Sequence, residues 1–480
     1  MSTRKSLAWS FSQQFGQVGL QFVGSVIIAR LLTPGEMGIF ALALAVSFVL
    51  STLRSFGIVT YLIREEELTE DKIRTAFGIM IVLGGVLGLI LLLSRGFVAE
   101  LYDEPGMADV LLLLAIGYFI SPIGQPAQGL LSREMRFDLL HHITLAMTVV
   151  TLGINIALAL LGFSYMALAW GLLAGNVVQA VLLILAKPDH LRMTPSFSHW
   201  REVIRFGGYM TGIAIVGTFQ SEGTKFLLGG FINPAAVALY DRAAQIPDLV
   251  RQSLFNPIAR VFLPVFSKDI REGRSIGPGV LKLISANTVI VWPVFLSIGI
   301  ISAPFIVLLF GENWRTAGEI LPFLLIEGAI VASLPQPDQI LIPHGRVKRL
   351  FKIRTTALVV NIVVTAVTAS HSLELFANAR PFMAMFFIAL VIGSIHRYLS
   401  VDAKAVLREY GNSIVVALFC APPALLFRLY GDQNLTILML LGIIAGSAVL
   451  WLGGLIVTRN FLAGEILRSM KSGAKIFGLK

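Results

Sequence analysis

The chain has 480 residues, of which 56% are hydrophobic and 14% are charged, with a formal net charge of +10. Soluble globular proteins carry about 25% charged residues, so this composition excludes a soluble fold and predicts a membrane protein. The basic pI near 9.8 would indicate nucleic-acid binding only if the cations gathered on an exposed domain, which they do not.

Fourteen segments are apolar enough to cross a bilayer as helices of about 20 residues. They are centred near residues 21, 48, 86, 119, 152, 175, 219, 252, 293, 331, 362, 390, 419 and 446. The uncharged run 143–186 predicts two of these helices, joined by a hairpin near residues 162–164. The spans near 48, 219 and 252 contain charged residues.

The distribution of Lys and Arg orients these spans. If both termini are cytoplasmic, 28 of the 38 cations fall in inside segments, four in outside segments (Arg95, Arg315, Arg380 and Arg428) and six within spans. This alternation follows the positive-inside rule, and a missed or added helix would disrupt it. The sequence therefore predicts fourteen spans with both termini in the cytoplasm.

An internal duplication relates the two halves of the chain. Residues 31–40 align with residues 231–240 at an offset of 200, and the Gln-Pro-x-Gln segment 125–128 aligns with 336–339 at an offset of 211. Six spans per repeat is an even number, so both copies enter the membrane in the same direction. Parallel repeats of this kind occur in transporters, with the solute site between the halves.

The resulting prediction is an all-α polytopic membrane protein with two six-helix lobes and two C-terminal helices. We expect an N-lobe at 1–190, a C-lobe at 207–400, spans thirteen and fourteen at 401–458, and a basic cytoplasmic tail at 459–480. Residues 191–206 connect the lobes. Phe197, Trp200 and Val203 recur there at helical spacing beside Arg201 and Arg205, which predicts an amphipathic helix on the inner membrane surface.

Charged side chains inside a bilayer are costly and normally face a partner or a cavity. The six cations within spans are Arg30, Arg54, Lys225, Arg242, Arg251 and Arg260, and all lie in spans one, two, seven and eight. Polar residues share helix faces with them: Gln13, Gln17 and Gln21 in the first span, and Asp241, Gln245 and Asp248 in the eighth. Within the other ten spans, the only acids are Glu327 and Asp338, and both lie in the tenth.

This arrangement predicts a cationic, water-filled cavity for an anionic head group, because arginine binds phosphate in a fork geometry. The expected substrate-contacting residues are Arg54, Arg242, Arg260, Arg251, Lys225, Gln17 and Gln21. The acids Glu222, Asp241, Asp248 and Glu327 are expected to form coupling or structural ion pairs. Glu222 with Lys225 and Asp248 with Arg251 have the i, i+3 spacing of local salt bridges. At the level of sequence, these pairs can be either functional groups of the cavity or structural salt bridges.

Motifs for catalysis are absent from the sequence. There is no Walker A loop, no Gly-x-Ser-x-Gly elbow and no Asp-x-Asp cluster, and the seven histidines lack metal-ligand spacing. We therefore expect no catalytic residues, no metal and no cofactor.

Two segments resemble a known family: ARLLTPGEMGIF at 29–40 and QGLLSREMRF at 128–137. The chain is similar to the polysaccharide transporters of the multidrug/oligosaccharidyl-lipid/polysaccharide exporter superfamily, in particular the bacterial flippases called Wzx. The resemblance implies two six-helix lobes around a cationic cavity. It also implies transfer of undecaprenyl-pyrophosphate-linked oligosaccharides from the inner to the outer leaflet of the cytoplasmic membrane, by alternating access, for exopolysaccharide, lipopolysaccharide or capsule synthesis.

The expected partners are the lipid-linked oligosaccharide and membrane lipids, with the polysaccharide polymerase and chain-length machinery as candidates, and no nucleic acid. Two alternatives remain at the level of sequence. An exporter of drugs or other amphiphiles would be expected to have a more acidic cavity, and a membrane-embedded acyl- or glycosyltransferase would need a reactive acid, histidine or metal site near a membrane surface.

Overall fold

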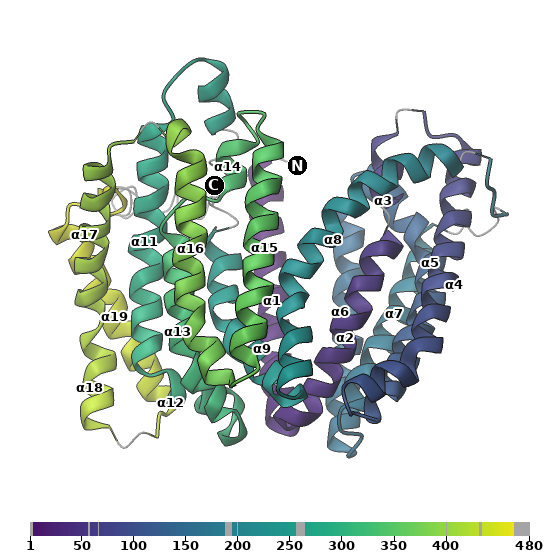
Figure 1. The fold of residues 1–480 in the computed structure, drawn as a ribbon, viewed down its shortest axis with the longest axis horizontal. Helices are drawn as coiled ribbons and strands as arrows, with labels where there is room; N and C mark the ends of the chain where they lie inside the picture. The colour runs from purple at the N-terminus through teal and green to yellow at the C-terminus, as the bar shows by residue number, and fades with distance from the viewer. Residues whose placement is uncertain are drawn as a thin grey trace. The chain divides into compact units, whose positions relative to one another are not determined.

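A computed structural model describes residues 3–55, 58–65, 67–187, 194–198, 200–255, 265–399, 401–431 and 434–464. Regular structure throughout these ranges is helical (Figure 1). The chain divides into two compact units, Met1–Ala238 and Leu239–Lys480. The lobe bounds expected from the sequence stay a prediction.

The first unit contains α1 (Thr3–Leu31), α2 (Pro34–Ser55), α3 (Ile58–Arg64), α4 (Glu70–Leu101), α5 (Gly106–Arg133), α6 (Phe137–Leu160), α7 (Met166–Ala186) and α8 (Trp200–Phe231). Helix α9 (Pro234–Val250) begins in this unit and continues into the second. The hairpin expected near 162–164 is present between α6 and α7. From Trp200 onward, the expected interfacial linker belongs to α8.

The second unit continues with the π-helical turn η2 (Arg251–Phe255), α11 (Gly277–Ile300), α12 (Ser302–Phe310), the 3-10 turn η3 (Glu312–Trp314), α13 (Arg315–Ala332), α14 (Pro337–Leu341), α15 (Val347–Ala369), α16 (Leu373–Leu399), α17 (Ala403–Cys420), α18 (Pro422–Tyr430) and α19 (Ile437–Val457). Each of the fourteen predicted span centres lies in a helix.

Ten helices of the described ranges are long and apolar enough to cross a membrane, and α17 with α18, bent by 41°, makes an eleventh candidate. Helix α1 contributes a shorter apolar stretch, Gly16–Leu31, and α8 and α9 carry the charges noted above. The protein is therefore a multi-pass membrane protein with an all-α fold, consistent with fourteen spans.

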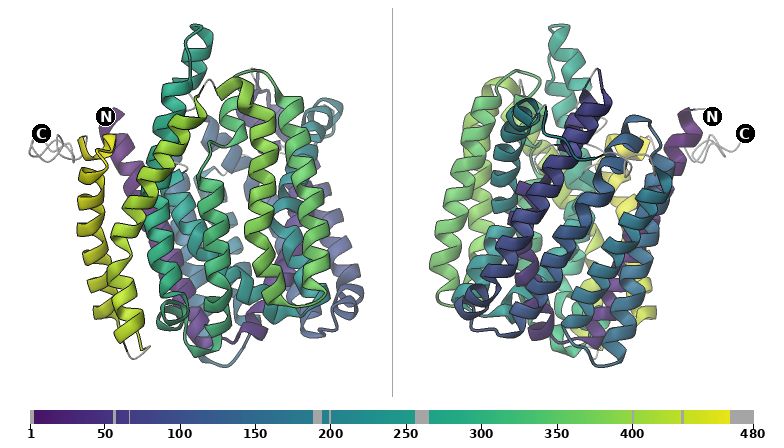
Figure 2. Two further views of the ribbon diagram at one scale, coloured as in Figure 1. Left: turned by 60° about the vertical axis from the view of Figure 1, so that its left-hand side comes forward. Right: turned by 90° about the vertical axis from the view of Figure 1, so that its right-hand side faces the viewer.

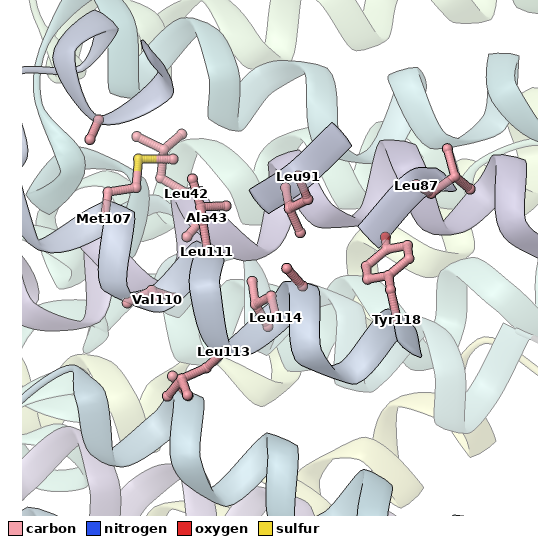
Figure 3. Close-up of a cluster of buried hydrophobic side chains, with 13 residues drawn as sticks. Leu42, Ala43, Leu87, Leu91, Met107, Val110, Leu111, Leu113, Leu114 and Tyr118 are labelled. Atoms are coloured by element: carbon pink, nitrogen blue, oxygen red, sulfur yellow. The ribbon is translucent and has the colours of Figure 1, made fainter. Parts of the chain in front are cut away.

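A buried apolar cluster holds the first unit together (Figure 3). Leu42 of α2, Leu91 of α4 and Leu111 of α5 are completely buried in it. Small residues allow the helices to approach: a Cβ at Gly84 of α4 would lie 2.5 Å from the ring of Pro122 in α5. Since a bilayer gives no hydrophobic gain for helix association, such close packing at small residues is what joins membrane helices.

The duplication is visible in how equivalent helices begin. Helices α2 and α9 both start at a proline, a residue suited to the first helical position, and the preceding residue caps each helix. The Thr33 hydroxyl accepts a hydrogen bond from the Glu36 amide at 3.4 Å, and the Asn233 side chain accepts one from the Ala236 amide at 2.8 Å. Residues offset by 200 thus form the same kind of helix start.

The repeats also share a helix end. The Arg136 amide donates to the Leu131 carbonyl at 3.0 Å, and the Arg346 amide donates to the Leu341 carbonyl at 2.9 Å. The intervening residues, Met135 and Gly345, both have positive φ, as expected for a left-handed helix cap. The copies differ before this point, because α5 runs unbroken through its two prolines whereas its counterpart is interrupted between α13 and α14.

The three C-terminal helices pack in the second unit, beside α11 (Figure 2). The Trp451 indole of α19 donates to the Val289 carbonyl of α11 at 2.9 Å. Thr288 of α11 and Ser413 of α17 are hydrogen-bonded at 2.7 Å. Polar contacts therefore tie the appended helices to the second repeat.

Candidate functional site

The predicted site residues of the first unit lie on α1, α2 and α8. Gln17 is partly buried and Gln21 is exposed on α1. Arg54 lies on α2, and its side chain is outside what the structure describes. Two turns of α2 and α8 meet next to it, where the hydroxyls of Thr52 and Thr218 are 2.6 Å apart.

Lys225 and Glu222 form the local ion pair that their spacing predicts. The Lys225 Nζ to Glu222 Oε2 distance is 3.1 Å, and the two side chains are 20% and 13% exposed. Both residues lie on α8, so the pair neutralises charge within a single helix, which is how intramembrane ionisable residues are usually accommodated.

Asp248 and Arg251 also pair, at the junction of α9 with the π-helical turn. Nη2 and Nε of Arg251 lie 2.9 and 3.1 Å from the same carboxylate oxygen of Asp248. Both side chains are at least half exposed, so this pair is far more accessible than the pair on α8. Arg260 lies outside the described residues.

Arg242 lies among aromatic side chains. Its guanidinium carbon is 5.6 Å from the ring centres of both Phe310 and Trp314, and it donates a 2.8 Å hydrogen bond to Gln245. The residue at the equivalent position of the first repeat is Leu42, which is buried in the apolar cluster. Arg242 thus occupies a core-like position where aromatic faces stabilise its charge. Its expected contact with substrate stays a prediction.

Glu327 of α13 pairs with Arg380 of α16. Nε of Arg380 lies 2.8 Å from Oε2 of Glu327, and Nη2 lies 2.5 Å from Oε1. The side chains are 21% and 11% exposed, respectively. Nη1 of Arg380 is buried and has no hydrogen-bond partner among the described residues.

Aromatic residues from two helices border this pair. The Phe376 ring centre is 5.7 Å from the Arg380 guanidinium, and Tyr240 of α9 packs edge-on against Phe376 at 5.5 Å. The second unit therefore brings α9, α13 and α16 together at one polar cluster, which we call the α9–α13–α16 cluster (Tyr240, Glu327, Phe376 and Arg380).

The sequence assigned Arg380 to an outside segment, whereas in the structure it lies within α16 and pairs with Glu327. The apolar run of this span starts after Pro381, but the helix itself begins at Leu373. Arg380 can lie within it because Glu327 supplies a counter-charge. The acid in the tenth span was the available signal, since a carboxylate in a membrane helix requires a basic or hydrogen-bonding partner.

In the described part of the chain, no three His, Cys, Asp or Glu side chains are grouped so that they could hold a metal ion. The clusters consist of arginine, lysine, carboxylates, amides and aromatic rings. Such groups can bind and release a polar solute without forming covalent bonds to it.

Comparison with known proteins identifies the family. The family described as "Polysaccharide biosynthesis protein" matches residues 27–319. The chain belongs to this family.

Curated relatives cover about 70% of the chain. It is 24% identical over 345 residues to the teichuronic acid biosynthesis protein TuaB of Bacillus subtilis, covering 69% of each chain. It is 22% identical to the lipopolysaccharide biosynthesis protein WzxC of Escherichia coli, covering 72% of this chain and 70% of that one. The succinoglycan biosynthesis transport protein ExoT of Rhizobium meliloti is 24% identical, with 68% and 66% covered.

Among solved structures, the lipid II flippase MurJ in an inward closed conformation has the same fold. The TM-score is 0.75 at 13% sequence identity, and the match covers 94% of this chain and 99% of the other. At this identity the likeness concerns the fold alone. It confirms the predicted fold class, a polytopic all-α protein.

Proposed function

We propose that this protein is a flippase that moves lipid-linked oligosaccharides across the membrane for polysaccharide biosynthesis. The observation that carries the proposal is the family match over residues 27–319. In addition, 94% of the chain matches the fold of a lipid II flippase. The name of one relative includes transport, and others are named for synthesis of cell-surface polysaccharides.

The physical need for such a protein is clear. An oligosaccharide must shed its hydration to enter hydrocarbon, and each unsatisfied hydroxyl costs several kcal/mol (about 4–8 for transfer to cyclohexane). A protein that offers polar side chains within the membrane lowers this barrier while the lipid tail remains in the bilayer. The partly exposed polar groups on α1, α9, α13 and α16 support this role.

The finer identity of the substrate belongs to the same proposal. We take the carrier to be undecaprenyl pyrophosphate and the membrane to be the bacterial cytoplasmic membrane, with both termini in the cytoplasm. Arg54, Arg242 and Arg260 are the proposed head-group contacts, supported by the affinity of arginine for phosphate. Outward movement of an anion is also favoured by a potential negative inside, by about 2.3 kcal/mol per charge per 100 mV.

The polymerase and chain-length machinery are proposed to act on the product, because repeat units delivered to the outer leaflet must be joined there. Both catalytic alternatives, an acyltransferase and a glycosyltransferase, would make a different product. They are distinguished from a flippase by which intermediate accumulates when the protein is absent.

A deletion strain tests the proposal. We expect complete lipid-linked repeat units to accumulate, protected from a membrane-impermeant glycosidase in spheroplasts, and polysaccharide at the cell surface to be lost. Repeat units that lack a sugar or an acyl group would instead favour a transferase. Repeat units that remain complete and fully accessible from outside would contradict flipping.

A further inference from the structure

The ion pair of the α9–α13–α16 cluster leaves one buried hydrogen-bond donor of Arg380 without a partner among the described residues. Glu327 engages two of the three nitrogens of the Arg380 guanidinium, and the third, Nη1, is a buried donor with no partner among the described residues. Leaving a buried donor unsatisfied is destabilising. The arrangement therefore favours a ligand that accepts a hydrogen bond from Nη1.

The charge of the pair restricts which ligand fits. Glu327 and Arg380 neutralise each other, so the site has little attraction for a net anion, and a pyrophosphate oxygen next to the pair would face the Glu327 carboxylate. A metal cation would face the guanidinium. A hydroxyl group suits the pair better, because it accepts a hydrogen bond from an arginine N–H and donates one to a carboxylate oxygen.

The aromatic residues extend this argument to sugars. The Phe376 ring lies against the Arg380 guanidinium and is completely buried. Tyr240 packs edge-on against Phe376 and is partly exposed, so Tyr240 supplies the apolar ring surface beside the polar groups. A pyranose has the matching surface, with hydroxyls at its edge and C–H groups on its faces. The exposed fractions, 21% for Glu327 and 11% for Arg380, leave an edge of the pair accessible.

We propose that Glu327, Arg380 and Tyr240 form a binding subsite for an uncharged sugar of the transported oligosaccharide. The inference rests on the proposed function and adds to it a separation of roles: the pyrophosphate is held by arginines elsewhere, and the glycan by a neutral pair. The cluster is held by three helices of the second unit, so the bound sugar would bridge α9, α13 and α16.

Replacement of the whole pair separates this role from a structural one. A buried ion pair can often be replaced by apolar residues with no loss of stability, so Glu327→Leu with Arg380→Leu is expected to fold. A second double variant, Glu327→Gln with Arg380→Gln, removes both charges but keeps neutral donors and acceptors. The control is Asp269→Leu with Arg274→Leu, which removes another ion pair of the same unit, with Arg274 Nε 3.1 Å from an Asp269 carboxylate oxygen.

The readouts are surface polysaccharide per copy of protein in the complemented deletion strain and lipid binding by native mass spectrometry. We expect the leucine pair to lower export by about tenfold or more, the glutamine pair to export more than the leucine pair, and the control to match wild type. Purified wild-type protein should prefer the lipid-linked repeat unit extracted from the deletion strain over undecaprenyl pyrophosphate, and the leucine pair should lose this preference.

Wild-type export by the leucine pair, or an unchanged preference for the glycosylated lipid, would overturn the subsite. If the leucine pair is not produced, the glutamine pair decides: loss of all export in a folded glutamine variant would show that the ion pair itself, and not hydrogen bonding to a sugar, is required. Failure of the wild-type protein to bind either lipid would contradict the proposed function.

Discussion

Single charged residues in this protein are accommodated in three different ways. Lys225 is neutralised within its own helix by Glu222. Arg242 lies against Phe310 and Trp314. Arg380 is paired across helices with Glu327. Each solution lowers the cost of placing a cation in a membrane protein, and only the last leaves a buried donor unused.

The proposed phosphate contacts can be tested individually. We expect Arg54→Ala and Arg260→Ala each to reduce surface polysaccharide by about tenfold or more, because an arginine bound to phosphate makes charge-assisted hydrogen bonds worth about 1.5–3 kcal/mol. Protein amounts should be unchanged. Lys404→Ala, which removes an exposed cation, is the control, and wild-type polysaccharide in both variants would remove these residues from the site.

Arg242 is expected to behave differently. Because its guanidinium contacts two aromatic rings and Gln245, Arg242→Lys should lower the thermal stability of the purified protein by an amount equivalent to about 1 kcal/mol. Thermal denaturation in detergent, followed by tryptophan fluorescence, measures this change. Lys282→Arg provides a comparison at a position without such contacts in the structure, and equal stability of Arg242→Lys and wild type would contradict the assigned packing.

Close helix contacts depend on individual glycines. A Cβ at Gly38 would lie 1.9 Å from the Pro234 carbonyl oxygen, whereas a Cβ at Gly35, in the same helix start, meets nothing within 4 Å. We expect Gly38→Ala to destabilise the first unit by about 1–3 kcal/mol and Gly35→Ala to have little effect. The comparison of their melting temperatures in detergent checks this, and equal melting would show that the α2 to α9 contact is not made.

At the scale of helices, a short segment before α8 is docked on α4. The Arg74 carbonyl accepts a hydrogen bond from the Ser196 amide at 3.2 Å, and Arg74 Nε donates to the Thr194 carbonyl at 2.9 Å. Gly78 is the point of closest approach, since a Cβ there would lie 2.5 Å from the Ser196 carbonyl oxygen. The connection between the repeats is thus fixed to the first unit.

Substitution of Gly78 should release this segment. We expect Gly78→Val to increase the rate at which trypsin cleaves between residues 187 and 201, because the valine side chain cannot fit beneath Ser196. Gly85→Val, on the same helix with open space around it, is the control. An unchanged cleavage pattern in Gly78→Val would show that the segment is not held at this position.

Much of this helical architecture could be predicted from the sequence, because long apolar runs leave the backbone no alternative to a helix in a bilayer. The helix starts at Pro34 and Pro234 follow from local capping chemistry. The partner of Glu327 could not be predicted, since an ion pair between residues 53 positions apart depends on how α13 packs against α16. Likewise, no sequence spacing indicates that Phe310 and Trp314 enclose Arg242.

At the scale of the whole molecule, the duplication gives two repeats that share helix starts and helix ends but differ in their polar clusters. The first unit has a leucine at the position where the second has Arg242, and the Glu327–Arg380 pair joins counterparts of α5 and α7. The two repeats thus differ chemically, as expected for the proposed substrate, which has an anionic end and a sugar end.

Cysteine labelling tests the topology. In a Cys420→Ser background, Phe163→Cys in the α6–α7 hairpin should react with an impermeant maleimide in intact cells. Ser275→Cys, in the segment before α11, should react only after the membrane is permeabilised. Both positions are exposed, so access to the reagent depends on the side of the membrane. The reverse pattern would contradict the orientation derived from the Lys and Arg distribution.

Transport by the purified protein is the most direct test of the account. Liposomes that contain the lipid-linked repeat unit in both leaflets expose about half of it to an added impermeant glycosidase, because head groups inside are protected. We predict that reconstituted protein makes nearly all of the glycan accessible within minutes, and that Glu327→Leu with Arg380→Leu does not. Protection of half of the glycan in liposomes that contain folded wild-type protein would contradict the flippase function.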